Sequence, residues 1–123
     1  MKMPWWMPFG TVPEIDAHEL QARLRGRSPP QVLDVRTDAE WRAGHIGGAI
    51  HAPVTELKSR LPSLGLDSNR PVVAVCRSAH RSIPAVRVLR SLGFDAVQLR
   101  EGMQAWWREG LPLEVREGSE GGS

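Results

Sequence analysis

"PVVAVCRSAHRSIPAVRVLRSLG", residues 71–93, is the stretch that decides the fold. Its first five residues are apolar without alternation, which is typical of a strand covered on both faces of a sheet. The loop that begins at Cys76 is polar. Ser82 is then expected to be the N-cap of a helix with Pro84 in its first turn and Gly93 at its C-terminal stop. The apolar residues of that helix fall on one side: Ile83, Val86 and Leu89. The stretch therefore predicts a strand, a loop and a helix, the order used by parallel α/β sheets.

Apolar strand-like runs and helical patterns also alternate in the rest of the chain. Further strands are predicted over residues 31–35, 47–53 and 95–99. Further helices are predicted over residues 15–25, with Asp16 as the N-cap, and over residues 38–44, 55–61 and 103–110. This order predicts one α/β domain with a mostly parallel central sheet of about five strands, flanked by helices on both faces.

The folded body is expected to span residues 11–116. Residues 1–10, "MKMPWWMPFG", are interpreted as a leader, and residues 117–123, "EGSEGGS", as a flexible tail. The leader contains two prolines and no continuous hydrophobic stretch, so it is a poor signal peptide. Its tryptophans and methionines suggest that it docks back onto the domain or meets a partner, and we favour docking.

The composition excludes several classes of protein. The chain has 123 residues, of which 41% are hydrophobic and 24% charged, and no apolar run approaches the roughly 18 residues that a membrane span needs. Its net charge is only +2 and its arginines are scattered, which argues against nucleic-acid binding. A single cysteine allows no internal disulfide, and no cysteine–histidine spacing suits zinc, so we expect no metal and a reducing, cytoplasmic setting.

Cys76 ends the most apolar predicted strand, at the edge of the sheet where ligands of such folds collect. A free thiol has a pKa of about 8.5, so it needs help to ionise at neutral pH. The backbone N–H groups of residues 77–81, the start of the following helix, and Arg77, Arg81 and His80 are expected to supply that help and to leave the sulfur open to solvent. The alternative is a small buried side chain at a strand end, but a buried inert cysteine gains nothing from two arginines nearby.

Three segments in order resemble the rhodanese-like sulfurtransferase family. "CRSAHRS" at residues 76–82 resembles its active-site loop, "VLDVRTDAEWRAGHIGGAIHAP" at 32–53 another hallmark segment, and "LREGMQAWWREGLPLE" at 99–114 its closing segment. Four residues separate Cys76 from Arg81, as in the sulfurtransferases, whereas the related phosphatases and arsenate reductases have five. The shorter loop suits a single sulfur atom better than a tetrahedral oxyanion.

The resemblance implies a sulfurtransferase in which Cys76 is the catalytic nucleophile. It takes a sulfane sulfur from a small anionic donor such as thiosulfate, holds it as a persulfide, and passes it to a nucleophilic acceptor such as cyanide or to a sulfur-acceptor protein. No metal or organic cofactor is implied. The predicted anion-binding loop consists of Arg77, Ser78, Ala79, His80 and Arg81.

Two positions depart from the family pattern. Family loops usually have glycine where Ala79 stands, and the closing segment usually has two adjacent glycines where Glu101 and Gly102 stand. If the backbone there needs a positive φ, alanine or glutamate is strained.

Three residues are predicted to support the cysteine loop: Asp34, Arg36 and Ser82. The resemblance implies that Asp34 hydrogen-bonds the loop, through Ser78 or Arg81, and the alternative is a carboxylate satisfied by neighbouring backbone. Arg36 is expected to hold the loop or face the donor.

Other polar and aromatic residues have simpler interpretations. For Arg36 the alternative is a surface ion pair with Asp38 or Glu40. His45 is expected to satisfy backbone groups at a turn and His80 to lie on the rim of the site. Of the two neighbouring tryptophans, Trp106 and Trp107, one ring is expected to be buried and the other partly exposed.

The competing functional hypothesis is a non-catalytic binding module that uses the rhodanese-like fold to recognise a protein partner, with the leader as the adhesive segment. The intact cysteine loop argues against it.

Overall fold

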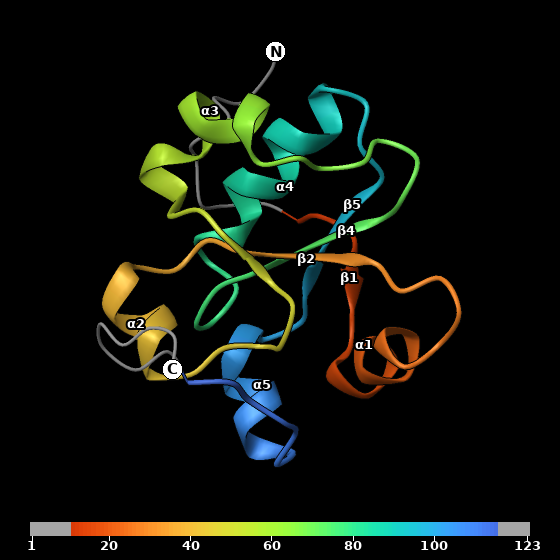
Figure 1. The fold of residues 1–123 in the computed structure, drawn as a ribbon, viewed down its shortest axis with the longest axis vertical. Helices are drawn as coiled ribbons and strands as arrows, with labels where there is room; N and C mark the ends of the chain where they lie inside the picture. Colours follow the sequence, from red (N-terminus) through yellow and green to blue (C-terminus); the bar gives the residue numbers. More distant parts are fainter. Residues whose placement is uncertain (1–10, 116–123) are drawn as a thin grey trace.

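The core of the protein is a parallel five-stranded sheet, seen in a computed structural model that describes residues 11–115. The strand order is β1-β5-β4-β2-β3, and every neighbouring pair is parallel (Figure 1). The strands are β1 Glu14–Ile15, β2 Gln31–Asp34, β3 Ile50–His51, β4 Val72–Val75 and β5 Ala96–Leu99. The predicted α/β fold class and strand number are confirmed. The predicted leader and tail lie outside the described residues.

Helices cover both faces of this sheet, as predicted. Helices α1 and α5 lie on one face and α3 and α4 on the other, while α2 follows the carboxyl end of β2 (Figure 1). The helices are α1 Ala17–Leu24, α2 Asp38–Ala43, α3 Leu57–Arg60, α4 Ser82–Ser91 and α5 Gly102–Arg108, with short 3-10 turns at Val54–Glu56 and Leu61–Ser63. In the described part of the chain, every helix is too short and too polar to cross a bilayer.

Strand β4 shows why the quoted stretch has no polar alternation. Val72 and Ala74 face the cluster under α3 and α4, whereas Val73 and Val75 face the cluster under α1 and α5. Both faces of β4 are therefore shielded from water, and the side chains on each face contribute to the hydrophobic core. Cys76 continues the alternation and belongs to the α4 side.

The predicted N-cap is confirmed at α1 and wrong at α4. Asp16 accepts a hydrogen bond from the backbone N–H of Glu19 at 2.8 Å, which confirms it as the N-cap of α1. The prediction that Ser82 caps α4 is wrong, because Arg81 occupies the cap position and Ser82 is the first helical residue. The Ser82 hydroxyl is buried and makes side-chain contacts instead.

Strand β1 was not predicted. It has two residues, pairs only with β5 at the edge of the sheet, and carries no hydrophobic period that a sequence pattern could reveal. Strand β3 is shorter than the predicted range 47–53 and covers only residues 50–51.

Candidate active site

Cys76 lies directly after β4, at the carboxyl edge of the sheet, but its side chain is only 1% exposed. The expectation that the sulfur is open to solvent is therefore wrong. The sulfur packs under α4, and within residues 11–115 its one hydrogen bond is to the Ser82 hydroxyl at 3.7 Å. The loop above it does face solvent, since Arg77 and His80 are exposed.

The backbone N–H groups of this loop are available to bind a ligand. Among residues 11–115, no protein group accepts a hydrogen bond from the backbone N–H groups of residues 77–81. The loop faces solvent, so these five N–H groups are available to water or to a bound ligand. An anion above the loop would accept hydrogen bonds from them.

Helix α5 holds the carbonyl side of the same loop. The backbone N–H of Met103 donates to the Cys76 carbonyl at 2.8 Å, and that of Gln104 donates to the Arg77 carbonyl at 3.0 Å. Gly102 has φ +58, and a Cβ there would lie 2.3 Å from the Cys76 carbonyl oxygen and 2.7 Å from the Arg77 carbonyl carbon. Only glycine allows the closing segment to approach the cysteine loop this closely.

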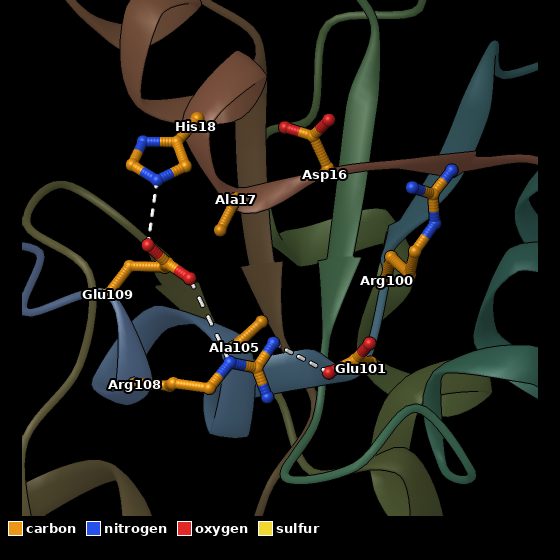
Figure 2. Close-up of a pocket in the computed structure, with 8 residues that line it drawn as sticks. All are labelled: Asp16, Ala17, His18, Arg100, Glu101, Ala105, Arg108 and Glu109. Carbon is orange, nitrogen blue, oxygen red and sulfur yellow. Dashed lines mark hydrogen bonds and ion pairs between the residues drawn. The ribbon is translucent and has the colours of Figure 1, made fainter.

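The two departures from the family pattern do fall at strained positions. Ala79 has φ 78 and Glu101 has φ 61, both in the left-handed region. Such a conformation costs a non-glycine residue about 1–2 kcal/mol. Figure 2 shows the Glu101 carboxylate accepting a hydrogen bond from Arg108, at 2.7 Å, which anchors the strained residue to α5.

Figure 2 also shows the pocket beside this contact, which has a volume of about 240 Å³. Within this pocket Arg108 pairs with Glu101 at 2.7 Å and His18 contacts Glu109 at 2.9 Å, whereas Arg100 pairs with Glu14 outside it. None of residues 76–82 is among the residues that line it, so this pocket is not part of the cysteine loop.

Arg81 is held by a residue that sequence reasoning placed elsewhere. Its two terminal nitrogens donate to the two carboxylate oxygens of Glu40, at 2.7 and 2.9 Å. The hydrogen bond from Arg81 lowers the pKa of Glu40 from its usual 4.5 to about 2, against the opposing effect of burial. The same carboxylate accepts from the backbone N–H of Thr37, so it ties the N-terminus of α2 to the cysteine loop.

Asp34 and Arg36 form a closed, buried pair. Asp34 accepts from the Arg36 side chain at 2.8 and 3.0 Å and from its backbone N–H at 3.0 Å, and Arg36 also donates to the Gly44 carbonyl at 2.8 Å. A buried guanidinium needs a carboxylate partner, and this one is two residues away.

The predicted roles of this pair are therefore corrected. Asp34 makes no hydrogen bond to Ser78 or Arg81, although its charge interacts with that of Arg81 at longer range. Its carboxylate is satisfied locally, by the backbone N–H and the side chain of Arg36. Arg36 is buried, so it neither faces a donor nor forms the surface ion pair. The pair braces the end of β2 against the end of α2.

The histidine predictions agree with the structure. His45 is buried, its Nδ1 lies 2.8 Å from the Trp41 carbonyl oxygen, and its ring stacks on that of Trp41 at 3.4 Å. His80 is exposed at the rim, where its Nδ1 lies 3.0 Å from the Ser78 hydroxyl.

The two neighbouring tryptophans divide as predicted. Trp106 is buried and donates its indole N–H to the Pro112 carbonyl at 2.8 Å. Trp107 is 42% exposed.

Two polar residues near the sulfur were missed. Gln98 interrupts the otherwise apolar β5 and accepts a hydrogen bond from Ser82, and Glu14 of β1 accepts one from Gln98. The single amide side chain in the apolar run "DAVQL" could have pointed to Gln98 as a buried polar residue. No sequence pattern pointed to Glu14, because β1 was not predicted. Residues 11–115 hold no group of three or more histidine, cysteine, aspartate or glutamate side chains placed to bind a metal ion.

The chain belongs to the rhodanese-like domain family, whose sequence profile matches residues 16–109. A sulfurtransferase of Allochromatium vinosum is 38% identical over 108 residues, which cover 87% of this chain and 99% of that protein. A solved structure of a rhodanese-like domain protein from Staphylococcus aureus has a TM-score of 0.76 and 35% identity, and the match covers 86% of this chain and 100% of that one.

Another relative shows the domain in a longer protein. An HTH-type transcriptional regulator of Mycobacterium tuberculosis is 42% identical over 95 residues, which are 74% of this chain but 41% of the regulator. The chain therefore spans less than half the length of that relative.

Proposed function

We propose that the protein is a sulfurtransferase that carries a sulfane sulfur on Cys76 from an anionic donor such as thiosulfate to a nucleophilic acceptor such as cyanide. The observation that carries this proposal is a thiol directly beneath a solvent-facing loop whose backbone N–H groups have no protein partner among residues 11–115. The similarity to a sulfurtransferase over nearly the whole chain supports the same class of reaction.

The proposed reaction has two displacements. The Cys76 thiolate attacks the outer sulfur of thiosulfate, a new S–S bond forms, and the donor's S–S bond breaks with its electron pair leaving on sulfite. The carbon of cyanide then attacks the terminal sulfur of the persulfide, thiocyanate leaves, and the electron pair returns to the Cys76 sulfur. No net oxidation of the protein occurs.

The loop residues have distinct proposed parts in these steps. The backbone N–H groups of residues 77–81 stabilise the negative charge of the bound donor and of the persulfide. Arg77, exposed and without a side-chain partner in the described part of the chain, attracts the anionic donor. Arg81 adds a fixed positive charge, while Ser78 and His80 form the rim.

A sulfur-acceptor protein is a second proposed recipient. The similarity to part of a Bacillus subtilis protein that is named a sulfur carrier, 30% identical over 97 residues that are 51% of that protein, supports protein-to-protein relay as well as small acceptors. A reducing cytoplasmic setting, which the single free cysteine favours, would keep the thiol available. The non-catalytic binding module remains the competing proposal.

Mass spectrometry tests the proposal directly, because the chain has one cysteine. Protein treated with thiosulfate is expected to gain the mass of one sulfur atom, lose it on addition of cyanide, and release thiocyanate. The Cys76→Ser variant is the matched control and is expected to do neither. Absence of the added sulfur on the unaltered protein would support the binding module instead.

A further inference from the structure

A line of polar groups connects the buried sulfur to the protein surface. The Cys76 sulfur lies 3.7 Å from the Ser82 hydroxyl, which donates to the Gln98 side-chain carbonyl at 2.6 Å. The Gln98 amide nitrogen then donates to the Glu14 carboxylate at 2.8 Å. Ser82 is 0% and Gln98 4% exposed, so water does not offer these groups alternative partners.

The fold places these groups together. Glu14 is opposite Gln98 in the register of β1 and β5. Gln98 is two residues from Ala96, which faces the cluster under α4, so its side chain extends to the same face as the Cys76 sulfur. Arg100 donates to the other oxygen of Glu14 at 3.1 Å and keeps the carboxylate at this position.

The chemistry of the groups sets one direction for the whole line. A carboxylate only accepts hydrogen bonds, so the Gln98 amide must turn its nitrogen toward Glu14 and its oxygen toward Ser82. A hydroxyl has a single hydrogen, and Ser82 uses it on that oxygen. Ser82 then presents only the lone pairs of its oxygen to the sulfur. A thiol can donate its hydrogen to them, whereas a thiolate has no hydrogen to donate.

We propose that Glu14 and Gln98 are positioning residues that keep the hydrogen of the Ser82 hydroxyl directed at Gln98 and not at Cys76. They thereby favour the thiol over the thiolate in the resting protein. Ionisation of Cys76 then requires the Ser82 hydrogen to turn from Gln98 to the sulfur. That turn leaves the buried Gln98 oxygen without its partner. The inference rests on the proposed function only in that this thiol is the reacting group.

The test is the pH profile of iodoacetamide alkylation of Cys76, measured on the full chain by mass spectrometry. Gln98→Leu removes the acceptor without changing charge, so the Ser82 hydroxyl becomes free to donate to the sulfur. The midpoint of the profile is expected to fall by about 0.5–1 in pH, the size of effect that a hydrogen bond to a thiolate produces. In a Ser82→Ala background the same substitution is expected to have no effect.

Glu14→Gln provides a second test at the exposed end of the line, where folding is not at risk. The new amide can donate as well as accept, so Gln98 loses its fixed orientation and the midpoint is expected to fall in the same direction. Glu19→Gln, an equal change of charge on α1 at a residue paired with Arg23, is the matched control and is expected to leave the profile unchanged. Repeating the comparison in 0.5 M salt removes any long-range effect of charge.

Unchanged midpoints in both Gln98→Leu and Glu14→Gln would overturn the inference, and if Gln98→Leu does not fold, Glu14→Gln decides alone. A shift that survives in the Ser82→Ala background would also overturn it. The outcome is separable from the proposed function, because alkylation needs no sulfur donor. Variants with shifted profiles in a protein that never gains sulfur from thiosulfate would support this inference and contradict sulfur transfer.

Discussion

The two arginines of the cysteine loop have very different surroundings. Arg81 is half-buried and donates two hydrogen bonds to Glu40, whereas Arg77 is exposed and its side chain has no partner within residues 11–115. The sequence predicted the same electrostatic part for both. The difference shows that a positive charge near an anion site can be committed to the protein or available to the ligand, and that residue type alone does not distinguish the two.

The largest effect is expected where α5 packs against the backbone of the loop that carries both arginines. Gly102→Ala places a Cβ 2.3 Å from the Cys76 carbonyl oxygen, so α5 and the loop must separate. We expect a loss of about 3 kcal/mol in the free energy of unfolding, measured with urea, and loss of sulfur transfer.

Gly93→Ala is the matched control for this substitution. Gly93 also has a positive φ, 93, but a Cβ there meets nothing within 4 Å. It is expected to cost only the backbone strain, about 1 kcal/mol. Equal losses in the two variants would show that the close approach of α5 is not what holds the loop.

The ion pair between Arg81 and Glu40 is tested by Glu40→Gln. Because the pKa of Glu40 is lowered from 4.5 to about 2 in the folded protein, the ion pair stabilises it fully above pH 4.5, and this contribution is lost as the pH falls through 2. We expect the variant to be less stable by roughly 2 kcal/mol at pH 7 and the difference to vanish near pH 2. Urea unfolding across this range measures it.

Asp38→Asn on the same helix is the control, since its carboxylate is exposed and lies 3.5 Å from Arg42 and 3.6 Å from His51. An exposed pair of this kind contributes little, so no comparable acid dependence is expected. If Glu40→Gln behaves like Asp38→Asn, the contact with Arg81 does not stabilise the protein.

The attraction of the anionic donor by the exposed Arg77 is tested by Arg77→Gln. Removing an exposed charge next to the loop is expected to raise the KM for thiosulfate about fivefold at low ionic strength, with kcat nearly unchanged, and the difference is expected to shrink in high salt. Arg70→Gln removes the same charge from the opposite end of β4, where Arg70 donates to the Pro29 carbonyl, and is expected to leave KM unaltered. If both substitutions raise the KM for thiosulfate equally, Arg77 acts only through the net charge of the protein and not through its position beside the loop.

The smallest effect is expected inside the loop, between the two arginines. Ala79→Gly relieves the strain of a φ of 78, while the unfolded chain gains conformational freedom. The net result is expected to be a stabilisation of about 0.5 kcal/mol, seen as a small rise in Tm. A lower Tm would mean that the alanine methyl group contributes contacts that offset the strain.

The parts of the site that sequence patterns predicted are those set by neighbouring residues. The position of Cys76 at a strand end and the solvent-facing loop follow from local runs of a few residues. The requirement for glycine at Gly102 does not, because it depends on how closely α5 approaches the carbonyls of Cys76 and Arg77. Ser82 shows the limit of such patterns. A serine before an apolar period predicts an N-cap, but burial beside Gln98 gave its hydroxyl another partner.

The sequence alone determined the alternation of strands and helices and the location of the thiol at the carboxyl edge of β4, and its departures from the family pattern pointed to the two positions that the structure shows to have a positive φ. Only the tertiary structure decided which groups surround that thiol. The contact between Arg81 and Glu40 joins residues 41 positions apart, and that between Gln98 and Glu14 joins residues 84 apart. Hydrophobic period and capping act within one element, whereas the pairing of buried polar groups depends on how elements meet, because each such group must find whichever partner the packed fold brings within reach.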